Sequence, residues 1–246
     1  MIEARDVKKR FGEQNVLDGV TLCIAEGESV VIIGRSGGGK SVLLKHLVGL
    51  IRPDSGDVII DGQNIVGLNE RQLLPVRRKF GMLFQGAALF DSMTVADNVG
   101  FALRREQSIA TTELNCRVSE ALEMVDLPGT EEKKPSELSG GMRKRVGLAR
   151  AIVYRPSIVL YDEPTTGLDP VVADSIDQLI VRVRDRLNVT SVVVTHDMRS
   201  ARRVGQRILM LHEGRIYAEG TPDEIFSSSD PIVHNFVNGI STKERN

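Results

Sequence analysis

Residues 34–41 read Gly-Arg-Ser-Gly-Gly-Gly-Lys-Ser and lie between two apolar runs, at residues 30–33 and 42–44. A buried strand, a glycine-rich turn and a helix start in this order are typical of a phosphate-binding loop, and the spacing fits G-x-x-x-x-G-K-[ST]. Glycines let the backbone bend so that successive N–H groups point at phosphate oxygens, and the following helix adds its positive dipole end. The stretch therefore predicts an α/β protein that binds a nucleotide.

Within this loop, Lys40 is expected to reach the β- and γ-phosphates, and the Ser41 hydroxyl to ligate Mg²⁺. The remaining loop residues should surround the phosphates: Gly34, Arg35, Ser36, Gly37, Gly38 and Gly39. The dinucleotide fingerprint G-x-G-x-x-G is not met, because Val42 stands where its last glycine would fall. A glycine-rich turn without a ligand is disfavoured, because Lys-Ser falls at the required place after an apolar run.

Composition narrows the class of protein. The chain has 246 residues, enough for one large domain, and a formal net charge of −1, which argues against nucleic acid as a partner. It contains no apolar run of the roughly 18–20 residues that cross a bilayer, and no signal-peptide pattern. Its two cysteines, Cys23 and Cys116, are far apart, so a reduced cytosolic compartment is expected.

Apolar runs alternate with helical patterns along the chain, which favours a parallel sheet with helices on both faces. Residues 1–33 are expected to form strands with turns, and residues 92–127 a helical insertion. Further on, a hairpin is expected at 207–218, with Gly214 in its turn, and a short helix near Pro222–Phe226. The whole chain is predicted to be a single domain, 1–246. Its expected parts are a core at 1–88 and 139–227, a helical subdomain at about 89–138, and a C-terminal tail at 228–246.

Polar residues follow three more apolar runs: Gln85, then Asp162 with Glu163, then His196. The carboxyl ends of parallel strands meet at one edge of a sheet, so these residues can converge on the nucleotide held at Gly34. Asp162 is placed as a magnesium partner, and Glu163 can orient or deprotonate water. Gln85 offers an amide to metal or water, and His196 can bind the γ-phosphate. Taken singly, a surface role explains either of these two equally well.

A second anion-binding turn is suggested by Leu138-Ser139-Gly140-Gly141, which precedes a helical pattern. An ordinary serine N-cap is the simpler explanation of these residues alone. The basic runs 143–145 and 77–79 are expected to lie on solvated faces. Phe11, beside Gly12, is either a buried core residue or a ring that stacks on adenine.

Taken together, these motifs resemble those of the ABC-type ATPases, the nucleotide-binding subunits of membrane transporters. The resemblance covers nearly the whole chain, and the motifs occur once each in the family's order. They are the Walker A loop 34–41, the Q-loop Gln85, the signature 138–141, the Walker B residues Asp162 and Glu163, the D-loop 167–169 and the switch His196. Met142 departs from the family pattern, which most often has Gln after the signature glycines.

The resemblance implies a head-to-tail homodimer in which the signature of one copy closes over the ATP of the other. Ser139, Gly140 and Gly141 would then complete the partner's site. It further implies that Phe11 stacks on adenine and that His196 fixes the γ-phosphate.

For the chemistry itself, the resemblance implies that Ser41 and Gln85 ligate Mg²⁺ with support from Asp162. Glu163 would act as general base, so the cofactors expected are ATP and Mg²⁺.

Four stretches, at residues 34–46, 82–90, 137–146 and 230–239, are similar to the ATPases of the Mla and Mce lipid transporters. This implies a subunit at the cytoplasmic face of the inner membrane that powers phospholipid trafficking. Its partners would be an integral-membrane permease (MlaE-like) and, through it, an MCE-domain protein (MlaD-like). A small STAS-type subunit is left open, as is another cargo such as amino acids or steroids.

Two other classes of protein stand as alternatives. A P-loop kinase is disfavoured by the signature turn and by His196 after a strand. A soluble ABC-type protein acting on DNA or ribosomes would carry a long insertion or two cassettes, whereas only 99 positions separate Lys40 from Ser139.

Overall fold

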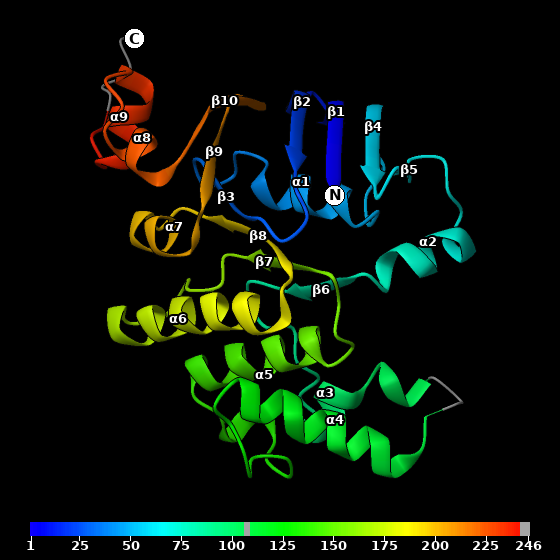
Figure 1. Cartoon of the computed structure of the whole chain (residues 1–246). Coiled ribbons are helices and arrows are strands. Elements are labelled where there is room, and N and C mark those ends of the chain that lie inside the picture. Colours follow the sequence, from blue (N-terminus) through cyan, green and yellow to red (C-terminus); the bar gives the residue numbers. More distant parts are fainter. Residues whose placement is uncertain (106–108, 242–246) are drawn as a thin grey trace. The chain divides into compact units, whose positions relative to one another are not determined.

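The computed structural model describes residues 1–105 and 109–241 (Figure 1). Residues 106–108 of the predicted helical subdomain and 242–246 of the predicted tail lie outside this range. The chain divides into two compact units: unit 1 comprises Met1–Val76 and Val192–Asn246, and unit 2 comprises Arg77–Ser191. The division predicted from the sequence has other boundaries and stays a prediction.

Unit 1 contains an antiparallel sheet built from the N-terminal quarter of the chain. Its strands are β1 (Ile2–Phe11), β2 (Gln14–Ile24), β4 (Ser55–Ile60) and β5 (Gln63–Asn64), in the order β2-β1-β4-β5. Ile2 pairs with Ile24 on one side and with Ile60 on the other, and all three side chains are buried. The expected strands with turns in residues 1–33 are thereby confirmed.

The strand that leads into the phosphate loop is β3 (Ser29–Ile33), which also belongs to unit 1. All five of its residues are buried, as expected for a strand covered on both faces. It runs parallel to β9 (Arg207–His212), which pairs with β10 (Arg215–Gly220) in the predicted hairpin. β8 (Thr190–Thr195), which enters unit 1 at Val192, is the other neighbour of β3.

The helices of unit 1 are mostly short. The helix after the phosphate loop is α1 (Lys40–Leu47), and α2 (Glu70–Arg77) leads to the unit boundary. Within the described residues of unit 1, α7 (Met198–Val204) follows β8, and α8 (Pro222–Phe226) and α9 (Pro231–Val237) follow the hairpin. α8 lies where the sequence predicts a short helix.

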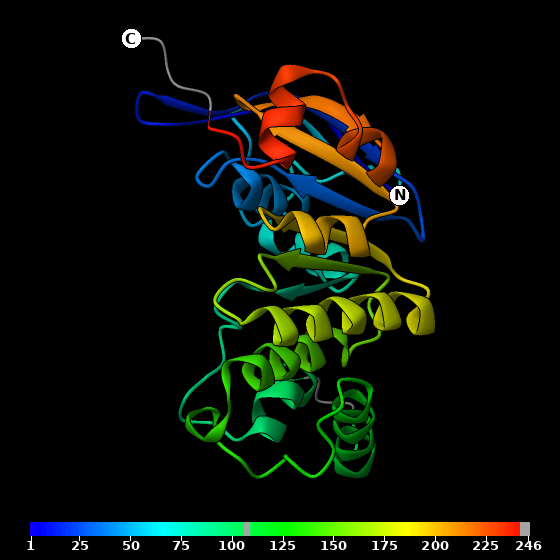
Figure 2. The ribbon, with the colours of Figure 1, turned by 90° about the vertical axis from the view of Figure 1, so that its left-hand side faces the viewer.

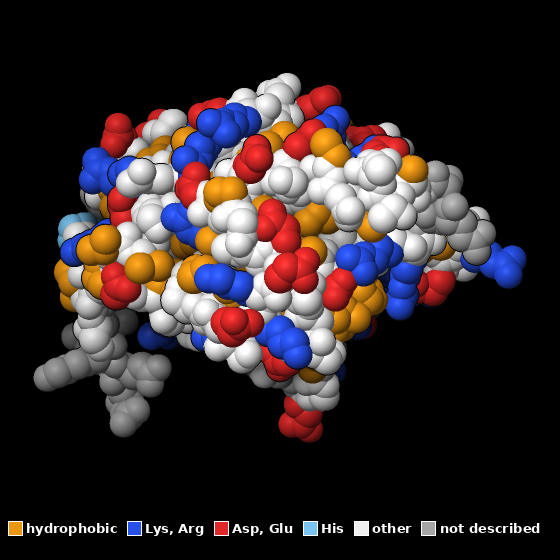
Figure 3. Space-filling view, turned by 90° about the horizontal axis from the view of Figure 1, so that it is seen from below, with side chains coloured by type: hydrophobic (Ala, Val, Ile, Leu, Met, Phe, Trp, Pro, Cys, Tyr) orange, Lys and Arg blue, Asp and Glu red, His pale blue; other side chains and the backbone are white. Residues whose placement is uncertain are grey.

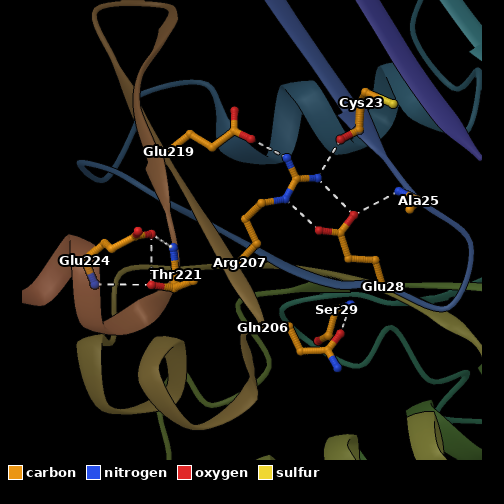
Figure 4. Close-up of polar contacts among 9 residues, drawn as sticks. All are labelled: Cys23, Ala25, Glu28, Ser29, Gln206, Arg207, Glu219, Thr221 and Glu224. Carbon is orange, nitrogen blue, oxygen red and sulfur yellow. Dashed lines mark hydrogen bonds and ion pairs between the residues drawn. The ribbon is translucent and has the colours of Figure 1, made fainter.

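A polar cluster fixes the turn before β3 to the start of β9 (Figure 4). The Arg207 guanidinium donates to both carboxylate oxygens of Glu28 at 2.6 and 2.9 Å and to the carbonyl of Cys23 at 2.6 Å. It also pairs with Glu219 of β10. The Ser29 N–H donates to Gln206 Oε1 at 2.9 Å. Since these contacts hold the first residue of β3, they fix the position of the strand and of the phosphate loop that follows it.

Unit 2 is a parallel strand pair stacked on helices (Figure 2). β6 (Phe80–Leu83) runs parallel to β7 (Ile158–Asp162), and α5 (Gly140–Ile152) contacts β6 as well as the neighbouring helices. Those neighbours are α3 (Val95–Gly100), α4 (Thr111–Met124) and α6 (Pro170–Leu187). Two 3-10 turns, at Leu103–Arg105 and Pro135–Glu137, complete the expected helical region.

The face of the molecule seen in Figure 3 intersperses Lys and Arg with Asp and Glu. No helix within residues 1–105 and 109–241 is both long and apolar enough to cross a membrane.

The close approach of β6 to α5 gives a test of the unit 2 core. A Cβ on Gly81 would lie 2.2 Å from the carbonyl oxygen of Ala151, which is helix backbone and cannot swing away. We expect Gly81→Ala to lower the free energy of unfolding in urea by about 2–3 kcal/mol, the cost typical of overpacking. Gly67→Ala is the control, because nothing lies within 4 Å of its Cβ position. Equal stability of the two variants would contradict this packing.

Candidate functional site

Several positions of the phosphate loop in unit 1 need glycine for physical reasons. Gly37 and Gly39 have φ of +75° and +97°, in the left-handed region that other residues rarely adopt. A Cβ on Gly39 would also lie 2.9 Å from the carbonyl oxygen of Val16, and one on Gly34 would lie 2.4 Å from that of Leu211. The loop is therefore pressed against β2 and β9, with α1 beginning directly after it.

Lys40 lies across this loop. It is only 5% exposed, and its Nζ donates to the carbonyl oxygens of Gly34 at 2.9 Å and Arg35 at 3.1 Å. These acceptors belong to the loop that is expected to hold the phosphates, so the positive charge is already placed within it. The hydroxyl of Ser41, the amide of Gln85 and the carboxylate of Asp162 are hard oxygen donors of the kind Mg²⁺ prefers. The residue types thus fit Mg-ATP.

Two further candidates in unit 1 lie at the ends of strands. Phe11 ends β1 and is 48% exposed, so the core alternative for its ring is wrong. His196 is exposed between β8 and α7, where Asp197 caps the helix by accepting from the N–H groups of Arg199 and Ser200. Stacking on adenine and binding of the γ-phosphate stay proposals.

In unit 2, Asp162 ends β7 and Glu163 follows it, both buried. Glu163 is 8% exposed and has φ of +49°, a strained value for a residue with a side chain. Its Oε2 accepts a hydrogen bond from Thr166 Oγ1 at 3.1 Å. Backbone strain of this kind tends to gather at functional sites, where the surroundings hold it in place.

Lys144 corrects the expectation that residues 143–145 lie on a solvated face. Arg143 is exposed as expected, but Lys144 is 5% exposed and its ammonium donates to the carbonyl oxygens of Gln85 and, at 3.2 Å, Glu163. Burial lowers the pKa of Lys144, while the negative charges of Asp162 and Glu163 act in the opposite direction.

The helical period of α5 could have revealed this. Position 144 lies three residues after Gly141 and four before Leu148, and both of those residues are buried. The run of three basic residues at 143–145 suggested an exposed face, although Lys144 lies on the buried side of the helix.

The signature turn forms the N-terminus of α5. Ser139 is its N-cap, with Oγ accepting from the Met142 N–H at 3.2 Å, so the simpler explanation of this serine is confirmed. A Cβ on Gly141 would lie 2.6 Å from Val172 Cγ1, which explains the second glycine by packing. The cap uses a lone pair of the hydroxyl, so its proton is left to donate to an anion.

This cap gives a stability prediction that does not depend on any ligand. Ser139→Ala should lower the free energy of unfolding by about 1 kcal/mol, because one N–H of the first turn loses its acceptor. Ser139→Asn keeps an acceptor and should stay within about 0.5 kcal/mol of the parent protein. Urea unfolding of the three proteins measures both effects. If Ser139→Ala were as stable as the parent, the cap would have no energetic role.

Comparison with known proteins shows which family shares this sequence and fold. A family model described as ABC transporter matches residues 17–166. The dimeric structure of a post-hydrolysis state of the ATP-binding cassette MJ0796, bound to ADP and Pi, has a TM-score of 0.83 and 36% sequence identity. The match covers 90% of this chain and 99% of that one. It confirms the predicted fold class, a P-loop cassette with an antiparallel N-terminal sheet.

Three curated relatives align with nearly the whole of this chain. The probable ribonucleotide transport ATP-binding protein mkl of Mycobacterium leprae is 43% identical, over 97% of this chain and 69% of that protein. Protein TRIGALACTOSYLDIACYLGLYCEROL 3, chloroplastic, of Arabidopsis thaliana is 41% identical, over 97% and 74%. The methionine import ATP-binding protein MetN of Carboxydothermus hydrogenoformans is 43% identical, over 93% and 68%.

This chain spans about two thirds of the length of the mycobacterial relatives it matches. The family match extends over more than half of the chain and includes the phosphate loop, Gln85, the signature turn and the two carboxylates at the end of β7. The chain therefore belongs to the ABC transporter family.

Proposed function

We propose that this chain hydrolyses Mg-ATP with Glu163 as the general base, as the ATPase subunit of a transporter. The observation that carries the proposal is Glu163 itself. Its carboxylate is buried, held by Thr166 and set on a strained backbone directly after Asp162. A base must be held within hydrogen-bond reach of the water it activates, and a buried, fixed carboxylate suits that task.

The other roles follow from the donor types and their elements. Lys40 and the loop N–H groups bind the phosphates, Phe11 stacks on adenine, and His196 contacts the γ-phosphate. Ser41 and Gln85 ligate Mg²⁺, with Asp162 in support. When bound, Mg²⁺ neutralises charge on the phosphates during transfer.

We further propose a head-to-tail homodimer in which Ser139, Gly140 and Gly141 complete the partner's ATP site. Support comes from the placement of the three residues at the N-terminus of α5, where N–H groups and the helix dipole favour an anion. The similar cassette bound to ADP and Pi is itself dimeric.

For the cargo, we propose phospholipid or a related lipid, moved through an integral-membrane permease and an MCE-domain protein. The chain would act at the cytoplasmic face of the inner membrane. Support comes from the four stretches similar to Mla and Mce ATPases, and from a relative whose name is that of a galactolipid. Import of an amino acid is the second candidate, favoured by the relative named for methionine import.

The role of Glu163 is tested by Glu163→Gln, which keeps the size of the side chain but removes the base. We expect ATP to bind with unchanged affinity, and phosphate release to fall at least about 100-fold, the usual contribution of general-base catalysis. Steady-state phosphate release and equilibrium binding of ATP measure the two. Hydrolysis near the rate of the parent protein would remove Glu163 from this role.

The cargo is tested by affinity purification of the tagged chain from detergent-solubilised native membranes, with proteins and lipids identified by mass spectrometry. We expect a permease, an MCE-domain protein and co-purifying phospholipid. A small STAS-type protein in the same preparation would identify an additional subunit. A permease with a solute-binding protein and no lipid enrichment would leave the ATPase assignment in place but exclude the lipid cargo.

A further inference from the structure

Helix α5 holds the segment after β6 by its backbone. Lys144 binds the carbonyl of Gln85, and Arg150 binds those of Ala87 and Ala88 at 2.6 and 2.7 Å. Gly147 lies midway between the two cations on the same face of the helix. A Cβ there would come within 2.8 Å of Leu83 Cδ1, so the helix and the segment are in close contact.

The held segment is strained. Ala87 and Ala88 have φ of +59° and +48°, and Glu163, the other residue bound by Lys144, has φ of +49°. Each such conformation costs of order 1–3 kcal/mol and persists only where neighbouring groups enforce it. Of the two cations, Lys144 is the one that reaches both segments, because its second acceptor is the Glu163 carbonyl at 3.2 Å.

We propose that Lys144 is a positioning residue for ATP hydrolysis, whose ammonium sets the backbone at Gln85 and Glu163 together. It touches no reacting atom. It acts by holding two residues whose side chains, under the proposed function on which this inference rests, serve the metal and the attacking water. Because Lys144 also lies five residues after Ser139 on one rigid helix, it ties both to the signature turn.

The test compares Lys144→Met with Arg145→Met in the full chain. Arg145 is a matched control: it also ties α5 to a backbone carbonyl, that of Val125 at 2.8 Å, and to the Asp126 carboxylate, away from Gln85 and Glu163. Since a misplacement of about 1 Å can cost on the order of 100-fold in rate, we expect Lys144→Met to lower kcat about 10- to 100-fold. The Kd for ATP should change by less than about threefold, because the phosphate loop is untouched.

Arg145→Met should lower the stability of the protein but not its kcat, which should stay within about twofold of the parent. Lys144→Arg keeps the charge and donors and should recover most of the kcat. If Lys144→Met does not fold, Lys144→Gln takes its place, since its amide can still donate to one carbonyl, and an intermediate kcat is expected.

Hydrogen exchange measured without nucleotide distinguishes a positioning role of Lys144 from a general loss of stability. Hydrogen exchange of Lys144→Met should be about tenfold faster in the peptide that spans Gln85 and in the peptide that follows Glu163, since both lose an anchor. In Arg145→Met the faster exchange should appear near Val125 instead.

Glu163→Gln is assayed alongside, so that failure of the proposed function can be told apart. Hydrolysis by Glu163→Gln near the parent rate would overturn both the function assigned to Glu163 and the role of Lys144. If Glu163→Gln is inactive, a kcat within twofold of the parent in Lys144→Met, or equal kcat losses in Lys144→Met and Arg145→Met, would overturn the role of Lys144 alone.

Discussion

A single buried ammonium joins three parts of unit 2 that lie far apart in the sequence. Lys144 on α5 binds the carbonyl of Gln85 after β6 and that of Glu163 after β7. Removing a charge from water is costly, and two carbonyl dipoles with the neighbouring carboxylates offset that cost only when their geometry is kept. The interaction therefore constrains the helix and both strand ends at once, and the strained conformation of Glu163 depends on such a constraint.

Lys40 and Lys144, the two buried lysines within residues 1–105 and 109–241, differ in how far along the sequence their partners lie. Lys40 binds carbonyls five and six residues away, within one loop that contains two glycines in left-handed conformations. Such local contacts can be exchanged for a ligand without disturbing the rest of the fold. The partners of Lys144 are 59 and 19 residues away, on separate elements. Exchange of those contacts would release both elements, so the same side-chain chemistry serves binding in one case and support in the other.

This difference in range also explains what the sequence could predict. The phosphate loop, the strand before it, the hairpin and α8 all depend on residues within a few positions of each other, and periodicity or turn residues indicate them directly. The cap role of Ser139 was likewise available as the simpler explanation. The burial of Lys144 was missed because neither partner is a neighbour in the sequence. Only the helical period of α5 pointed to it, and the basic residues on both sides favoured a solvated face.

The strained backbone beside α5 explains why the hydrogen-bond donors that hold it are charged. Ala87, Ala88 and Glu163 all have positive φ, and the carbonyls of all three accept from Lys144 or Arg150. Hydrogen bonds from a charged donor are roughly twice as strong as neutral ones, which suits them to hold backbone that would otherwise relax. Both cations lie on one helix that is capped by Ser139, so a shift of that helix would move all three strained residues together. Neutral donors on separate loops would hold each residue independently. Burying Lys144 and half-burying Arg150 on α5 therefore makes the strained segments move together rather than independently.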